Sequence, residues 1–195
     1  GLSSDGNIGK GRLSVRYNYN WTDRSYTDDS TLTRNGFSSY LTGRYKGSEH
    51  FAEIYWTLPI KNRLTWTSGA DLRSSFTDQD FLSVSSFGNY SSLYSKDSLN
   101  QKQWSGYSAF QFHGTSGWNI EAGARIVRHS RFGSHRILNI NPSYLLLNKW
   151  KLYANVSTGF RTPSLYQLLS EYGNPSLKPE RALTKEAGIQ YFASN

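Results

Sequence analysis

The segment Thr158–Glu180 reads TGFRTPSLYQLLSEYGNPSLKPE and separates two stretches in which apolar and polar residues alternate, Trp150–Thr158 and Leu183–Phe192. Prolines occupy positions 163, 175 and 179 of this segment. Proline cannot donate a hydrogen bond to a sheet, and it biases the preceding residue towards extended or turn geometry. The segment therefore predicts an ordered connection between two strands, with room for a helix only between Ser164 and Glu171.

Alternation of the same kind recurs along most of the chain and predicts about eight antiparallel strands. In the clearest case Leu13, Val15 and Tyr17 alternate with polar neighbours. The predicted strands cover residues 11–21, 52–58, 64–73, 104–112, 118–127, 139–147, 150–160 and 183–192. Each strand would have one apolar face and one polar face.

The connections between these strands alternate in length. Tight turns at 59–62, 114–117 and 148–149 alternate with long connections at 22–47, 77–102 and 161–182, and only the connection near Gly133 breaks the rule. We expect the 22–47 segment to be a long loop or a projecting strand pair. Trp66, Trp118 and Trp150 lie close to the tight turns. Outer-membrane β-barrels show this asymmetry and place aromatic girdles at the membrane interfaces.

The composition sets limits on the class of protein. Aromatic residues make up 15% of the 195 residues, whereas the hydrophobic fraction is only 36%, and no stretch is apolar enough for a transmembrane helix. A membrane barrel is compatible with this composition, because only alternate residues of its strands are apolar. The absence of cysteine excludes disulfides and thiolate chemistry. The net charge of +8 admits anionic partners.

Two short blocks connect the chain to a known family. GFRTPSLYQL and GNPSLKPE, in this order between two strands, resemble a segment of the TonB-dependent outer-membrane transporters. The similarity continues in AGAR at 122–125, HSRFG at 129–133 and KEAGIQY at 185–191. The resemblance implies an all-β fold, an antiparallel transmembrane barrel segment of about eight strands within a barrel of roughly 22 strands.

The resemblance also implies a function. Residues 1–195 would form part of one barrel domain, with a plug domain and the remaining strands outside this chain. The whole protein would lie in the bacterial outer membrane and import a ferric siderophore, cobalamin or a similar scarce nutrient. Its partners would be the TonB complex (through the plug), the nutrient chelate and outer-membrane lipid or lipopolysaccharide, without nucleic acid, cofactor or enzymatic activity.

Two sets of site residues follow. Aromatic side chains and one cation in the connections are candidates for ligand binding, namely Tyr90, Tyr94, Arg161, Tyr166 and Tyr172. Charged residues on the polar face are candidates for contact with the plug, namely Glu186, Arg125, Asp71 and Arg73. His129 and His135 flank the hairpin at Gly133, but the four histidines have irregular spacing, and no metal site is predicted.

Other classes remain open at this point. A complete small eight-stranded outer-membrane barrel would serve adhesion or structure, and a soluble β-sandwich would bury the apolar faces against a second sheet. Single-stranded nucleic acid would require lysines and arginines on one face, whereas here they are scattered along the chain. An enzyme has little support, because the sequence contains neither a GxSxG nor an HExxH motif.

Overall fold

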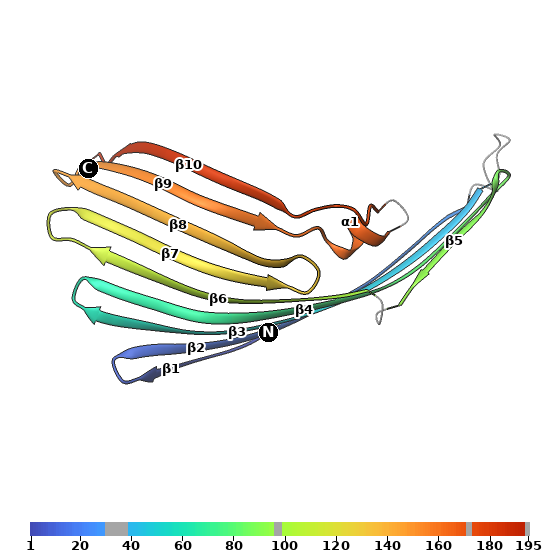
Figure 1. The fold of residues 1–195 in the computed structure, drawn as a ribbon, viewed down its shortest axis with the longest axis horizontal. Coiled ribbons are helices and arrows are strands. Elements are labelled where there is room, and N and C mark those ends of the chain that lie inside the picture. The colour runs from blue at the N-terminus through green and yellow to red at the C-terminus, as the bar shows by residue number, and fades with distance from the viewer. Residues whose placement is uncertain (30–38, 96–98, 171–172, 194–195) are drawn as a thin grey trace.

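The computed structural model describes residues 1–29, 39–95, 99–170 and 173–193, which form one antiparallel ten-stranded sheet (Figure 1). The strands follow the order β1-β2-β3-β4-β6-β7-β8-β9-β10, and β5 pairs with β4. Their bounds are β1 Leu2–Ile8, β2 Gly11–Asp29, β3 Ser39–Lys61, β4 Leu64–Ser85, β5 Gly88–Tyr94, β6 Asn100–His113, β7 Trp118–His129, β8 Gly133–Leu146, β9 Trp150–Arg161 and β10 Glu180–Tyr191. The single helix of this part of the chain, α1, spans Leu165–Leu169.

The antiparallel sheet is confirmed, with ten strands in place of about eight. The two additional strands are β1 and β5, which are short and rich in polar residues. Strands β2, β3 and β4 extend to 19, 23 and 22 residues. Much of the long connections predicted at 22–47 and 77–102 is therefore a projecting extension of these strands, which Figure 1 shows with β5 at its far end.

The register sorts the side chains into two faces. The apolar face carries Ile54, which pairs with Val15 and Ala70, and Ile140, which pairs with Ala122 and Val156. Its side chains are exposed, for example Ile126 at 58% and Ile189 at 66%. No second sheet covers this face in the described residues, which argues against a β-sandwich. We call the opposite face the polar face.

Lys185 is one of the charged residues that fall on the apolar face. It alternates in step with Leu183 and Ile189 on β10 and pairs with Val156 of the apolar face.

Aromatic pairs line the end of the sheet that carries the tight turns. Trp118 lies 4.9 Å from Tyr144, and Trp150 lies 4.6 Å from Tyr191, measured between ring centroids. Trp66 stacks on Phe110 at 6.3 Å. These rings form the predicted girdle. The turn at 148–149 is tight because Leu147 and Asn148 both adopt positive φ, at 52° and 54°.

Glycines within strands lie opposite tyrosines on the polar face. A Cβ atom on Gly69 would lie 2.6 Å from Tyr55 Cβ, and one on Gly188 would lie 2.4 Å from the ring of Tyr153. Each glycine is the register partner of its tyrosine. The absence of a side chain on these glycines lets the tyrosine side chain cross the neighbouring strand.

The connection from β9 to β10 contains a short helix, in the stretch where the prolines left room for one. Ser164 caps α1 by accepting a hydrogen bond from the Gln167 amide, while the Gln167 side chain accepts one from the Ser164 amide. This reciprocal arrangement is a capping box. Leu165 and Leu168 are buried, at 8% and 1% exposure. No helix in the described part of the chain is long and apolar enough to span a membrane.

Candidate functional site

The connection after β9 folds over the polar face at the end of the sheet opposite the girdle. Tyr166 of α1 meets the ring of Tyr45 of β3 edge-on at 5.9 Å. Tyr45 stacks on Tyr26 of β2 at 6.0 Å, with an angle of 8° between the rings. Arg131 donates to the Pro175 carbonyl oxygen at 3.3 Å and attaches the connection to the hairpin between β7 and β8. The three tyrosines, Tyr26, Tyr45 and Tyr166, form what we call the tyrosine row.

A cavity of about 410 Å³ lies on the polar face beside this connection. Its charged side chains are Glu49, Arg73 and Arg161. Arg73 pairs with Glu49 at 3.8 Å, and Arg161 pairs with Glu180 at 3.6 Å. The other lining residues are Ser75, Gln101, Gln103, His129, Phe160, Thr162, Pro163 and Ser164.

Two features show that this cavity is suited to a polar ligand. The Oε1 atom of Gln101 is buried and has no hydrogen-bond partner among the described residues. Buried polar atoms are nearly always paired, so an unpaired one in a cavity wall is available to a bound molecule or water. The Arg161 side chain remains largely exposed, with 67% of it accessible.

Deeper on the polar face, charged groups form ion pairs and hydrogen bonds with one another and with neighbouring hydroxyl groups. Arg125 donates to Asp71 at 2.6 Å and to the Ser105 hydroxyl at 3.0 Å, and Ser105 donates to Asp71 at 3.2 Å. The Asp71 side chain is only 2% exposed. Tyr107 donates to Glu53 at 2.8 Å. This polar network joins strands β3, β4, β6 and β7.

The ligand-binding candidates fall into two groups. Arg161 lines the cavity and Tyr166 belongs to the tyrosine row, so the structure brings these two to the same region. Tyr90 and Tyr94 lie on β5, paired with Ser83 and Gln79 in the projecting extension. Tyr172 lies outside the described residues. Whether any of these residues binds a ligand stays a prediction.

The candidates for plug contact all belong to the polar face. Asp71 and Arg125 pair with each other, and Arg73 lines the cavity. Glu186 lies opposite Asn155 on β10 and forms no ion pair with a described residue. Their contact with a plug stays a prediction.

The two histidines at the Gly133 hairpin have separate partners. His129 Nδ1 accepts from the Arg131 amide at 3.1 Å, and His135 Nε2 donates to the Phe132 carbonyl at 2.8 Å. In the described residues, no group of three or more histidine, aspartate or glutamate side chains could hold a metal ion.

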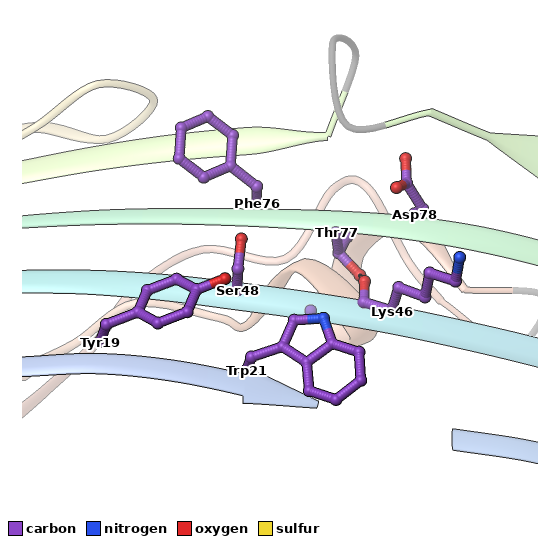
Figure 2. A pocket seen from close by; sticks show the side chains of 8 residues that line it. Tyr19, Trp21, Lys46, Ser48, Phe76, Thr77 and Asp78 are labelled. Atoms are coloured by element: carbon purple, nitrogen blue, oxygen red, sulfur yellow. Dashed lines mark hydrogen bonds between the residues drawn. The ribbon is translucent and has the colours of Figure 1, made fainter. Parts of the chain in front are cut away.

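A second hollow, of about 430 Å³, lies where β2, β3 and β4 leave the apolar band. Figure 2 shows the aromatic side chains of Tyr19, Trp21 and Phe76 in it, with Lys46 and Asp78 nearby. Just above, Arg44 donates to Asp23 at 3.0 Å, and this hydrogen bond lowers the pKa of the Asp23 carboxyl. Interfacial aromatic residues are expected at this boundary, so we read the hollow as part of a second girdle.

Sequence reasoning missed Tyr26, Tyr45 and Gln101. All three lie in segments that were interpreted as connections. The β-favouring tyrosines at 26, 40 and 45 were a signal for strands, but the many polar residues of the 22–47 segment obscured it.

The fold and its polar cavity can be compared with known proteins. A family model described as the TonB-dependent receptor-like β-barrel matches residues 2–195. The chain belongs to this family. It is therefore part of an outer-membrane receptor barrel, with its apolar face towards lipid and its polar face towards the lumen.

Two curated relatives match part of this chain. The iron-regulated outer membrane virulence protein of Vibrio cholerae serotype O1 is 28% identical over 107 residues, which cover 50% of this chain and 16% of the relative. The vitamin B12 transporter BtuB of Photobacterium profundum is 29% identical over 75 residues, 38% of this chain and 12% of the relative. The matched regions thus span less than a fifth of these relatives.

Solved structures share the fold of the receptor barrel. A mutant of the ferric enterobactin receptor PfeA of Pseudomonas aeruginosa superimposes with a TM-score of 0.72 and 20% identity, covering 97% of this chain and 31% of the receptor. The ferric yersiniabactin uptake receptor FyuA of Yersinia pestis gives a TM-score of 0.66 and 13% identity, covering 98% and 32%.

Proposed function

We propose that this chain forms part of the barrel wall of a TonB-dependent receptor that binds and imports a scarce nutrient, such as a ferric siderophore or cobalamin. The observation that carries the proposal is the lumen cavity beside the inward-folded connection after β9. Relatives and structural neighbours named as a vitamin B12 transporter and as ferric siderophore receptors support it. The plug domain and further strands would come from the chain outside this segment.

The chemistry of the site favours an anionic chelate with flat or apolar groups. The tyrosine row offers ring faces and edges, and stacked aromatic pairs are worth about 0.5–1.5 kcal/mol beyond their buried area. Arg161, although paired with Glu180 at 3.6 Å, supplies an exposed cation beside the cavity, and the carbonyl oxygen of Gln101 would accept a hydrogen bond from a hydroxyl or amide group of the ligand. Tyr90 and Tyr94 extend aromatic contact into the projecting strands, where a ligand would first arrive.

Of the four candidates for contact with the plug, Glu186 is the one that we expect to bind it most strongly. Arg125 and Asp71 already neutralise each other, and Arg73 has Glu49 nearby. Glu186 has no described ion-pair partner on the lumen face. A plug cation would therefore gain most from Glu186. Coupling to the TonB complex would run through that plug.

Binding by the full-length receptor tests the proposal. Titration with a panel of ferric siderophores and with cyanocobalamin should identify one tight ligand. Replacing both Tyr45 and Tyr166 by alanine should raise its Kd about tenfold, because two ring contacts are lost. Tyr40→Ala is the control, since Tyr40 lies on the opposite face of β3. Unchanged affinity in the double variant, or equal loss in the control, would exclude the tyrosine row from the site.

A further inference from the structure

Strands β8 and β9 are joined less completely than the strands beside them. Strand β7 pairs with β8 along its whole length, and β9 pairs with β10 along its whole length. The register between β8 and β9 instead ends at Asn139 and Ser157. Just beyond, the Thr158 hydroxyl accepts from the Leu138 amide at 2.9 Å and takes the place of a backbone partner. Residues 133–138 and 158–161 therefore run on without a shared ladder.

A second interruption lies lower between the same two strands. The pairing skips Asn141 and Pro142, which stand opposite Asn155 and Ala154, although the register is the same on both sides of the gap. Proline has no amide hydrogen to donate, and Pro142 keeps its place in the ladder with β7, so the missing donor is on the β9 side. Strands β8 and β9 are thus held together by two short paired stretches.

The free end of β9 carries one wall of the lumen cavity. Phe160, Arg161 and the residues at 162–164 line the cavity from this side. The same end of β9 pairs with the start of β10, as far as Arg161 and Glu180. The end of β9, the connection and the start of β10 therefore form one unit. We call this unit, residues 158–170 and 173–183, the flap.

Side chains of the β7–β8 hairpin hold the flap in place. The His135 ring stacks on Phe160 of the flap, with 3.7 Å between ring centroids, and its Nδ1 atom accepts from Arg181 at 3.4 Å. Its Nε2 atom donates to the Phe132 carbonyl oxygen at 2.8 Å. One ring nitrogen donates and the other accepts, so this arrangement requires the neutral imidazole. Arg131 adds a contact to the Pro175 carbonyl oxygen at 3.3 Å.

A proton on His135 would break this arrangement. The Nδ1 atom would carry a hydrogen and could no longer accept from Arg181, and two cations would face each other. The titratable and charged groups on the elements around His135 are His129 of β7, Arg131 of the hairpin, Arg136 of β8, Arg161 of β9 and Glu180 and Arg181 of β10. Glu180 offers little relief, because it pairs with Arg161 at 3.6 Å. Acid should therefore weaken the hold on the flap.

We propose that the flap opens and closes over the lumen cavity about a hinge at Asn139 and Ser157, and that neutral His135 latches it shut, so that acid opens it. This inference rests on the proposed function, because it gives the ligand cavity a movable wall that responds to pH. Tyr166 belongs to the flap and meets Tyr45 of β3. An open flap would separate these two rings and weaken ligand binding.

Distance measurements by electron paramagnetic resonance would test the inference on the full-length receptor in lipid nanodiscs, without ligand. Nitroxide labels would be attached to Ser176→Cys on the flap and Ser116→Cys in the tight turn at 114–117, with any cysteine elsewhere in the receptor replaced. We expect one distance at about pH 8 and a second, open population at about pH 5. The ratio of open to closed receptor should rise about tenfold, because a hydrogen bond and a ring contact are lost.

Variants of the latch separate its chemistry from general effects of acid. In His135→Gln the distances should no longer depend on pH, because the side chain cannot take up a proton. Arg181→Gln should reduce the response to about threefold, since no guanidinium then faces the protonated ring. The control is His113→Gln at the tight-turn end, where His113 bonds to Asn119 at 2.8 Å, and it should respond like the wild type.

Three outcomes would overturn the flap. They are a single distance in the wild type at both pH values, an unchanged response in His135→Gln, and an equal loss of response in His113→Gln. Because no nutrient is present, these distances decide on the flap even if the panel of siderophores and cyanocobalamin yields no ligand. Failure of the flap and failure of the proposed function are therefore separate results.

Discussion

At the scale of single residues, the lumen face is held together by charged groups that lie far apart in the sequence. The Asp71 carboxylate is almost fully buried and depends on Arg125 and Ser105 for its hydrogen bonds. A buried carboxylate without its partner is costly, because the charge loses its hydration without compensation.

We therefore expect Arg125→Gln to lower the free energy of unfolding of the full-length receptor by about 2–3 kcal/mol. Urea unfolding in lipid vesicles would measure the change. Adding Asp71→Asn to the variant should recover part of the loss, since the unpaired charge disappears. Arg63→Gln, at an exposed site where the side chain donates to the Thr115 hydroxyl, is the control and should have little effect. If the effects of the two substitutions on the free energy of unfolding simply added in the double variant, this account would be wrong.

At the scale of elements, the strands of the lumen face fit together through glycine and tyrosine partners. Gly69 lies against Tyr55 and near the Tyr107 hydroxyl, and Gly188 lies beneath the Tyr153 ring. Glycine in a strand usually weakens it, but here it permits a close approach that fixes which residues face one another.

A methyl group at either glycine should be destabilising for this reason. Gly69→Ala is expected to cost about 1–3 kcal/mol, because the new Cβ would overlap the Tyr55 side chain and the Ile54 carbonyl oxygen. Gly106→Ala provides the comparison, since its Cβ would meet nothing within 4 Å. The midpoints of urea unfolding would report both effects. Similar midpoints for the two variants would show that the close approach has no energetic weight.

At the scale of the whole molecule, the two faces of one sheet meet different surroundings. Apolar side chains remain exposed across the outer face, while the lumen face carries the cavity and the polar network. Only a lipid environment makes such exposure favourable, because water penalises contiguous apolar surface.

Arginine substitutions at adjacent positions of β8 should separate the two faces. Ile140→Arg places a charge among the lipid tails and is expected to cost about 2–4 kcal/mol near the midplane. Asn141→Arg, one residue along and on the lumen face, should be tolerated. The amount of heat-modifiable receptor recovered from outer membranes would measure the difference. If both variants assemble equally well, the assignment of the outer face is wrong.

Much of this architecture follows from local patterns. Alternation along a strand fixes which neighbours share a face, so the grouping of Leu13, Val15 and Tyr17 was predictable. The tight turn at 148–149 was predicted as well, and the prolines left room for a helix just after Pro163. Strands β1 and β5 were missed because their few apolar residues give weak alternation. The extensions of β2 and β3 were predicted only as one of two options for the 22–47 segment, and the extension of β4 into the 77–102 segment was not predicted.

The relation between distant residues could not be predicted in this way. The register decides that Asp71 faces Arg125, that Tyr26, Tyr45 and Tyr166 meet, and that β8 and β9 separate above Asn139. A local pattern cannot fix these contacts, because shifting the register of a strand by two residues keeps every side chain on its face and changes every neighbour. Sequence thus determined the faces, and the pairing of strands in the tertiary structure decided which residues form the lumen cavity and the tyrosine row.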